Sequence, residues 1–166
     1  MRNSTTHLLS LTTAAALGVL TALAQPASAQ EAQSQAIYPD IEQTLGSVPS
    51  FFRQLPETAI AGAWAEMKAF QLNPKTQLSG KSKELIGLAV AAQIPCQYCI
   101  YFHNAAAKAN GATDEEIKEA VAMAAVVRHW STVLNGMQVD LVAFKRDTDT
   151  VLRTAAEKSK TVGSGK

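Results

Sequence analysis

The chain has 166 residues, a formal net charge of +1 and 47% apolar residues. This length and apolar fraction predict one folded domain with a hydrophobic core and exclude a disordered chain. The near-neutral charge excludes a nucleic-acid-binding protein, because binding to phosphates needs a clear surplus of lysine and arginine. Two cysteines are too few for a disulfide-rich scaffold, and they lie close together as Cys96 and Cys99.

The first 29 residues have the three parts of a secretory signal peptide. Arg2 supplies a positive charge, residues 8–23 form an uncharged apolar run, and small residues precede a cleavage point after Ala29. The run is short for a membrane span, and an uncleaved anchor is the alternative. We therefore expect a secreted or periplasmic protein that leaves the membrane after cleavage. Thiols outside the cytosol tend to be oxidised, which bears on the cysteine pair.

The sequence after the leader predicts an all-α fold, because it has no alternating β pattern of useful length. Residues 30–36 are rich in glutamine, serine and alanine and predict a flexible linker. Several prolines follow, so any helix there is expected to be short, for example 40–45. Apolar residues at helical spacing then predict a helix over 56–70.

Two helices are predicted on either side of Pro95. The first covers residues 79–93, and Pro95 suits the first position of the second. The second helix is expected to run to about Ala109, where Asn110 and Gly111 predict a left-handed C-terminal cap.

The last two predicted helices follow this cap. Thr113 and Glu116 form a capping box that opens a helix reaching about residue 134, and another helix is expected over 137–158. The folded domain is therefore expected over 37–158, followed by a loose tail over 159–166. Its many alanines let helices approach closely, which suits a tight bundle or an oligomer interface.

The residues Cys96, Cys99 and His103 suggest redox chemistry. In a helix that starts at Pro95 they stand at positions i, i+3 and i+7, within about 60° of one another. The two-residue gap lets the cysteines close a small disulfide, and the helix N-terminus stabilises a thiolate. A redox-active pair needs both a polarised thiol and a second thiol within reach.

Glu84 lies on the predicted helix before the cysteines. If the two helices pack antiparallel, it faces the pair and can accept a thiol proton, directly or through His103 or a water. Taken alone, Glu84 is expected to be a solvated acid near Lys81 and Lys83, and His103 a packing histidine. His129, beside Trp130 on a later helix, could also line the pocket, but packing is its favoured role, because no spacing connects it to the cysteines.

The cysteine pair has three other interpretations. A c-type haem site needs a histidine directly after the second cysteine, where Ile100 stands. A zinc site could use Cys96, Cys99 and His103 with one carboxylate, although no second cysteine pair completes the common structural set. A plain structural disulfide is also open, but so short a loop removes little unfolded-state entropy. We expect no cofactor and no bound metal.

The stretches 78–92, 96–103 and 107–117 combine a glutamate, a Cys-x-x-Cys pair, a histidine and a Gly-x-[ST]-x-[DE]-E-[IV] motif. Together they resemble the alkylhydroperoxidase AhpD-like, carboxymuconolactone decarboxylase superfamily over about residues 45–145. The resemblance implies an all-helical bundle that is usually oligomeric, with trimers or hexamers common.

In the AhpD branch of that superfamily the cysteines form the redox centre, and the acid and the histidine relay protons. The resemblance therefore implies these roles for Cys96, Cys99, Glu84 and His103. Some AhpD members have histidine at the second position between the cysteines, where this chain has Tyr98, a weaker proton acceptor. The decarboxylase branch generally lacks the cysteine pair, so lactone decarboxylation is the less favoured activity.

We therefore expect an exported, homo-oligomeric, thiol-dependent oxidoreductase of the peroxidase or thiol-disulfide type. Its substrate is expected to be a hydroperoxide or a protein disulfide. The thiol reductant stays open, because the lipoyl-type partner of the cytosolic AhpD system is not expected outside the cytosol. The alternative is a non-enzymatic helical oligomer that binds a small molecule and has a structural disulfide.

Overall fold

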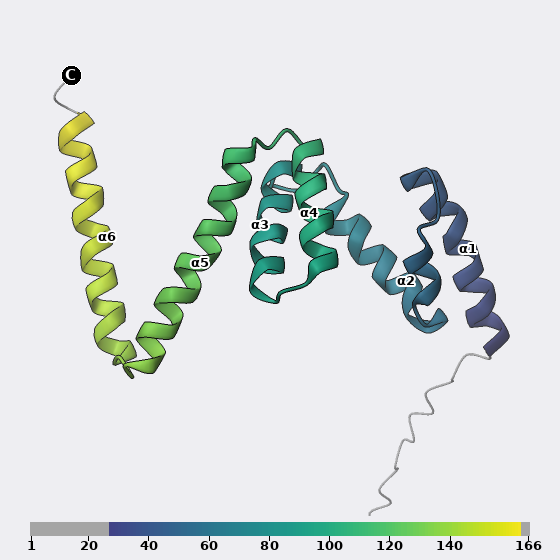
Figure 1. The fold of residues 1–166 in the computed structure, drawn as a ribbon, viewed down its shortest axis with the longest axis horizontal. Helices are drawn as coiled ribbons and strands as arrows, with labels where there is room; N and C mark the ends of the chain where they lie inside the picture. The colour runs from purple at the N-terminus through teal and green to yellow at the C-terminus, as the bar shows by residue number, and fades with distance from the viewer. Residues whose placement is uncertain (1–26, 164–166) are drawn as a thin grey trace, which may run out of the picture. The chain divides into compact units, whose positions relative to one another are not determined.

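The computed structural model describes residues 27–163, and the regular elements in that range are all helical (Figure 1). This confirms the predicted all-α fold class. Almost all of the predicted signal peptide lies outside the described residues. Among the described helices, none combines the length and the apolar character that crossing a membrane requires. The contacts within the chain divide the described residues into two compact units, with the boundary between Trp64 and Ala65.

The first unit contains α1 (Ala27–Leu45), the short 3-10 helix η1 (Ser50–Gln54) and most of α2 (Glu57–Glu66). Its core is formed by Ile41, Phe52, Ile60 and Trp64, each of which is buried. The rings of Phe52 and Trp64 meet edge to face with their centroids 5.7 Å apart. The indole N–H of Trp64 also donates to Asp40 at 2.7 Å, which satisfies the polar atom of this buried side chain.

Helix α1 is longer than the sequence predicted. It runs through residues 30–36, where a flexible linker was expected, and through 40–45, where a short helix was expected. Alanine and glutamine favour helix, and Pro39 inside α1 removes one backbone hydrogen bond without ending the helix. The burial of Ile41 adds packing that the local sequence does not reveal.

The second unit opens with the last residues of α2 and the π-helix η2 (Met67–Gln71). Four long helices follow: α3 (Gly80–Gln93), α4 (Gln97–Ala109), α5 (Asp114–Gly136) and α6 (Leu141–Gly163). Helix α3 packs against both α4 and α5. Leu88, Ala107 and Ile117, one from each of these three helices, are buried together in the core.

Helix α4 ends as predicted but begins later. Its first residue is Gln97, and Cys96 is the N-cap, so the expectation that Pro95 is the first helical residue was wrong. The backbone N–H of Cys96 donates instead to the carbonyl of Ala91 on α3. At the other end Gly111 has a φ of +81°, as predicted for a left-handed cap.

The ends of α5 and α6 differ from the prediction in part. The capping box is confirmed: Glu116 N–H donates to the Thr113 hydroxyl at 3.1 Å, and Thr113 N–H donates to the Glu116 carboxylate at 2.8 Å. Helix α6 begins at Leu141 rather than at residue 137 and continues to Gly163. Residues 159–163 are thus helical instead of a loose tail, because the good helix formers that precede them extend α6.

Candidate active site

The candidate site lies on the hairpin that α3 and α4 form (Figure 1). Ser79 starts α3 by accepting the N–H of Ser82 on its hydroxyl at 3.1 Å. The two helices are joined by a short turn at Ile94 and Pro95, and the Cys96 N–H donates to the Ala91 carbonyl at 3.1 Å. So short a connection makes the helices antiparallel neighbours. The antiparallel packing on which the role of Glu84 depends is therefore present.

Cys96 and Cys99 form a disulfide, with their Cα atoms 5.3 Å apart, and both residues are partly exposed. The Cys96 sulfur also accepts the backbone N–H of Cys99 at 3.2 Å and so caps α4. The first N–H groups of a helix lack partners inside it, and the helix dipole favours negative charge at this end. The same N–H therefore stabilises negative charge on the Cys96 sulfur when the bridge is reduced.

Glu84 and His103 form a close pair across the hairpin. The His103 Nδ1 atom lies 2.7 Å from Oε2 of Glu84. Glu84 is only 4% exposed, and among the described residues it is the one buried charged side chain. Burying a carboxylate is costly unless it is paired and hydrogen-bonded, so such a residue often serves function.

The other neighbours of Glu84 complete its surroundings. Its Oε1 atom accepts a hydrogen bond from the amide of Gln71 at 3.3 Å. The expectation of a solvated acid beside two lysines was wrong for this residue. Lys81 pairs instead with a glutamate of α5 at 2.8 Å, and Lys83 donates to a backbone carbonyl at 2.7 Å. His103 is therefore the ionisable partner of the buried carboxylate, rather than a histidine that only fills space.

His103 lies one helical turn after Cys99 on α4. Cys99 and His103 stand four residues apart on the helix, a spacing that places their Cβ atoms about 5–6 Å apart. The structure thus brings the four predicted residues, Glu84, Cys96, Cys99 and His103, to one hairpin. A buried carboxylate, an imidazole and two sulfur atoms are the kinds of group that acid–base and thiol chemistry use.

Gly87 lies against His103 in the same site, although the sequence alone does not show this contact. A Cβ atom built on Gly87 would lie 2.5 Å from both Nδ1 and Cε1 of His103. Glycine inside a helix costs about 1 kcal/mol relative to alanine, so its presence there calls for a reason. A helical glycine one turn after Glu84 was the available signal, but its neighbour on α4 becomes visible only in the folded chain.

A cavity of about 450 Å³ opens beside the Glu84–His103 pair. Both residues line it, and its apolar wall is formed by the exposed side chains of Phe70, Leu78 and Ile86. The cavity has room for an organic molecule that contacts the imidazole. Phe70 and Leu78 come from outside the α3–α4 hairpin, which is why helical spacing did not reveal this cavity.

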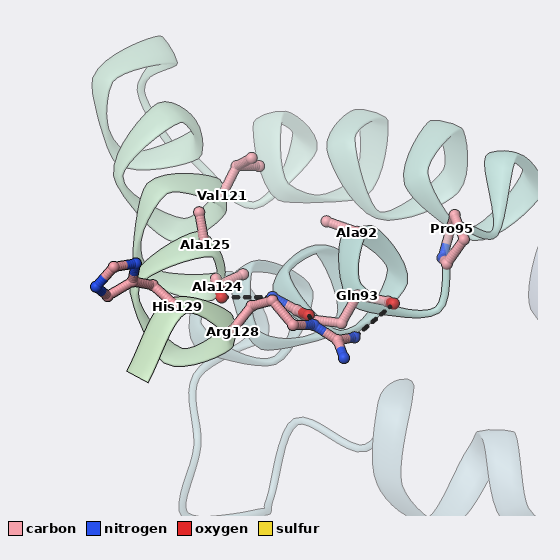
Figure 2. A pocket seen from close by; sticks show the side chains of 8 residues that line it. All are labelled: Ala92, Gln93, Pro95, Val121, Ala124, Ala125, Arg128 and His129. Atoms are coloured by element: carbon pink, nitrogen blue, oxygen red, sulfur yellow. Dashed lines mark hydrogen bonds between the residues drawn. The ribbon is translucent and has the colours of Figure 1, made fainter. Parts of the chain in front are cut away.

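A second hollow, of about 610 Å³, lies between the end of α3 and α5 (Figure 2). Across it the Arg128 guanidinium donates to the side-chain oxygen of Gln93 at 2.6 Å and to its backbone carbonyl at 3.2 Å. The Gln93 amide in turn donates to the carbonyl of Ala124. These hydrogen bonds hold α5 to the end of α3, directly before the turn that carries Pro95.

The remaining candidate residues lie on the surface. His129 lines the second hollow but is exposed, and its ring meets the ring of Trp130 edge to face. Within the described part of the chain, His129 is therefore not a buried packing residue but an exposed residue that lines this hollow. Tyr98, between the cysteines, is 80% exposed. Among residues 27–163 no three His, Cys, Asp or Glu side chains are placed to hold a metal ion, so the zinc alternative has no ligand set there.

Known proteins match the part of the chain that contains this site. A family model described as carboxymuconolactone decarboxylase family matches residues 58–140. A relative from Paracoccus denitrificans, "Uncharacterized protein 4 in cox locus", is 36% identical over 86 residues, which cover 49% of this chain and 78% of that protein. The crystal structure of the alkylhydroperoxidase AhpD core from Rhodospirillum rubrum matches with a TM-score of 0.60 and 27% identity, over 70% of this chain and 89% of that chain.

Proposed function

The chain belongs to the carboxymuconolactone decarboxylase family and has an AhpD-like fold, and we propose that it is a thiol-dependent oxidoreductase. Membership supports an alkylhydroperoxidase-like or related activity in broad terms. One observation carries the finer proposal: the buried Glu84 bonds His103 at 2.7 Å, and His103 follows Cys99 by one helical turn. A buried acid and imidazole beside a disulfide supply what proton-coupled thiol chemistry needs.

The proposed reaction starts from the reduced cysteine pair. One cysteine thiolate attacks an oxygen of a hydroperoxide, ROOH; the O–O bond breaks, and the sulfur becomes a sulfenic acid. The leaving alkoxide takes a proton and departs as the alcohol ROH. The second thiol then attacks the sulfenic sulfur, which forms the Cys96–Cys99 disulfide and releases water. Two electrons pass from the thiols to the peroxide, and an external thiol reductant returns them.

In this scheme Glu84 and His103 move the protons. The pair accepts the proton of the attacking thiol and returns one to the leaving oxygen. A protein disulfide as substrate uses the same residues, with a mixed disulfide in place of the sulfenic acid. Export to an oxidising compartment is part of the proposal and rests on the composition of residues 1–29.

In the non-enzymatic alternative the Cys96–Cys99 disulfide only stabilises the fold. The reduction potential separates the two, because structural disulfides have values below about −300 mV, whereas oxidoreductases have values from about −270 to −120 mV. We expect the Cys96–Cys99 pair to fall in the second range. The potential is measured by equilibrating the protein with defined ratios of oxidised and reduced glutathione and trapping the free thiols; a structural disulfide would stay oxidised throughout this series.

The direct test is a peroxide-consumption assay with dithiothreitol as reductant on Cys96→Ser and Cys99→Ser. Each variant lacks one sulfur of the pair, so turnover is expected to fall to the uncatalysed rate. Ala105→Ser adds a hydroxyl to an exposed position of the same helix and serves as the matched control, with unchanged activity expected. Full turnover in either cysteine variant, with the fold verified by circular dichroism, would refute the proposal.

A further inference from the structure

We propose that Gly87 is a positioning residue for His103: the missing side chain lets the imidazole lie against α3, where its Nδ1 reaches Glu84. The predicted effect on turnover rests on the function proposed above. The effect on the position of the ring does not depend on it. This assigns a role to a residue that is neither ionisable nor nucleophilic and that touches no reacting atom.

The distances show how closely the ring approaches. A Cβ on residue 87 would lie 2.5 Å from Nδ1 and Cε1 of His103 and 2.8 Å from Nε2. Ordinary contacts of a Cβ atom begin at 3.4 Å, so the imidazole would have to retreat by about 1 Å. Three ring atoms lie closer than 3.0 Å to this position, so the whole imidazole has to move.

Glu84 is poorly placed to follow such a shift. It is 4% exposed, and its second carboxylate oxygen accepts from Gln71 at 3.3 Å. The His103–Glu84 distance of 2.7 Å would therefore lengthen beyond that of a good hydrogen bond when the ring retreats. The carboxylate would keep its burial and lose its ionisable partner.

Other helical glycines show that this constraint is local. A Cβ on Gly62 of α2 would meet no atom within 4 Å. A Cβ on Gly80, at the start of α3, would overlap the end of the exposed Asn110 side chain, which lies outside the Glu84–His103 pair. Among these three helical glycines, Gly87 alone faces a member of the proposed proton relay.

The first test is a stability cycle made from Gly87→Ala, His103→Ala and the double variant. Gly87→Ala alone is expected to lower the melting temperature, because the added methyl group overlaps the imidazole. Without the imidazole the methyl group has room, so the double variant is expected to melt at or above the temperature of His103→Ala. Gly62→Ala is the matched control and should melt at or above the wild-type temperature. An equal loss in both backgrounds would show that Gly87 does not act through His103.

The second test follows the ring itself by ¹⁵N NMR of the histidine side chains. Gly87→Ala and Glu84→Gln should move the His103 Nδ1 resonance in the same way, whereas Gly62→Ala should leave it in place. An unchanged resonance in Gly87→Ala would overturn the positioning role.

Turnover of the same variants then separates the two proposals. Gly87→Ala should lower kcat about 10- to 100-fold, as a misplacement of about 1 Å does in other active sites, and change the pH profile as Glu84→Gln does. If Gly87→Ala moves the His103 resonance and lowers the melting temperature only when His103 is present, but leaves kcat and its pH profile unchanged, the positioning role stands and the relay function is wrong. If kcat falls without either response, the positioning role is wrong.

Discussion

Glu84 shows how a single side chain carries the functional argument. Its carboxylate is buried, and its partners are the imidazole of His103 and the amide of Gln71. A neutral polar or apolar residue could fill the same space without the cost of burying a charge. Retaining a carboxylate next to a histidine is therefore better explained by proton transfer than by stability.

The variant Glu84→Gln tests this interpretation. Glutamine keeps the shape of the side chain but accepts no proton, so we expect kcat/KM for hydroperoxide to fall about 100-fold, within the usual range for general acid–base catalysis. Glu119→Gln, on the exposed surface of α5, is the matched control and should retain full activity. Equal activity of the two variants would show that the buried carboxylate takes no part in the reaction.

The sequence revealed these residues to different extents. The spacing of Cys99 and His103 was readable from the chain, because both lie on α4 and helical geometry sets the neighbours there. Cys96 was expected on the same helix but is its N-cap, with an extended backbone. The pairing of Glu84 with His103 could be expected only on the condition of antiparallel packing. Gly87 was not found, because its role depends on an atom of the opposite helix.

At the scale of the helices, the N-terminus of α5 is fixed by a capping box that can be recognised in the sequence. Thr113 is its N-cap, and the hydroxyl accepts the Glu116 N–H at 3.1 Å. Thr113→Ala removes this acceptor and is expected to lower the free energy of unfolding by about 1 kcal/mol. Chemical denaturation measures the change, and Thr150→Ala, in exposed α6, is the control away from any helix end. A Thr113→Ala loss no larger than that of the control would contradict the role of the cap.

The first turn of α5 also predicts how stability depends on pH. A hydrogen bond from Lys81 lowers the pKa of Glu116, and one from Lys108 lowers the pKa of Asp114. Both carboxyls are easier to protonate in the unfolded chain, so their contribution is full above about pH 4.3, the ordinary pKa of a glutamate. It is lost as the pH falls through the lowered values in the folded protein.

Lys81→Met tests this dependence without touching either carboxyl. The variant removes the partner that lowers the pKa of Glu116, so the loss of stability between pH 5 and pH 3 should be smaller than in the wild type. Urea denaturation at a series of pH values gives the comparison. Lys145→Met, an exposed change on α6, is the control. Identical pH profiles of wild type and Lys81→Met would contradict the assignment.

The sequence predicted the presence of the helices better than their lengths. The ends of α4 and α5 carry local signals, the glycine cap and the capping box, and both were found. The length of α1 depends on packing around Ile41, which the local sequence does not show. Pro39 inside α1 also led to the prediction of a shorter helix, because proline usually ends or bends a helix. The start of α4 was misplaced because the Cys96 sulfur supplies the cap, a role usually filled by oxygen.

At the level of the whole molecule, many apolar side chains of α5 and α6 are exposed. Helix α6 packs little against the other described helices. Exposed apolar side chains on the two helices include Met123, Val127, Trp130, Val142, Val151 and Leu152. Large exposed apolar patches mark interaction sites. We therefore propose that the protein forms a homo-oligomer, the trimer or hexamer that its resemblance to the AhpD-like proteins implies.

Light scattering after gel filtration measures this assembly. The mature protein is expected to elute at a multiple of its monomer mass. Substituting both Val151 and Leu152 by aspartate should shift it towards the monomer, because charges disfavour burial of the α6 face. The same substitution at Thr150 and Thr154, exposed polar positions of α6, is the control and should leave the mass unchanged. A monomeric wild-type protein would exclude the oligomer.

The position of Cys96 as the cap of α4 has a consequence for what kind of redox protein this is. Its sulfur accepts the Cys99 N–H while the disulfide is closed, and a thiolate accepts such a bond at least as well. The first turn of α4 therefore has a capping acceptor in both oxidation states, and oxidation need not unwind it. A redox sensor reports its state through a change of shape. A cap that survives the reaction instead suits a catalyst, which returns to its starting form many times.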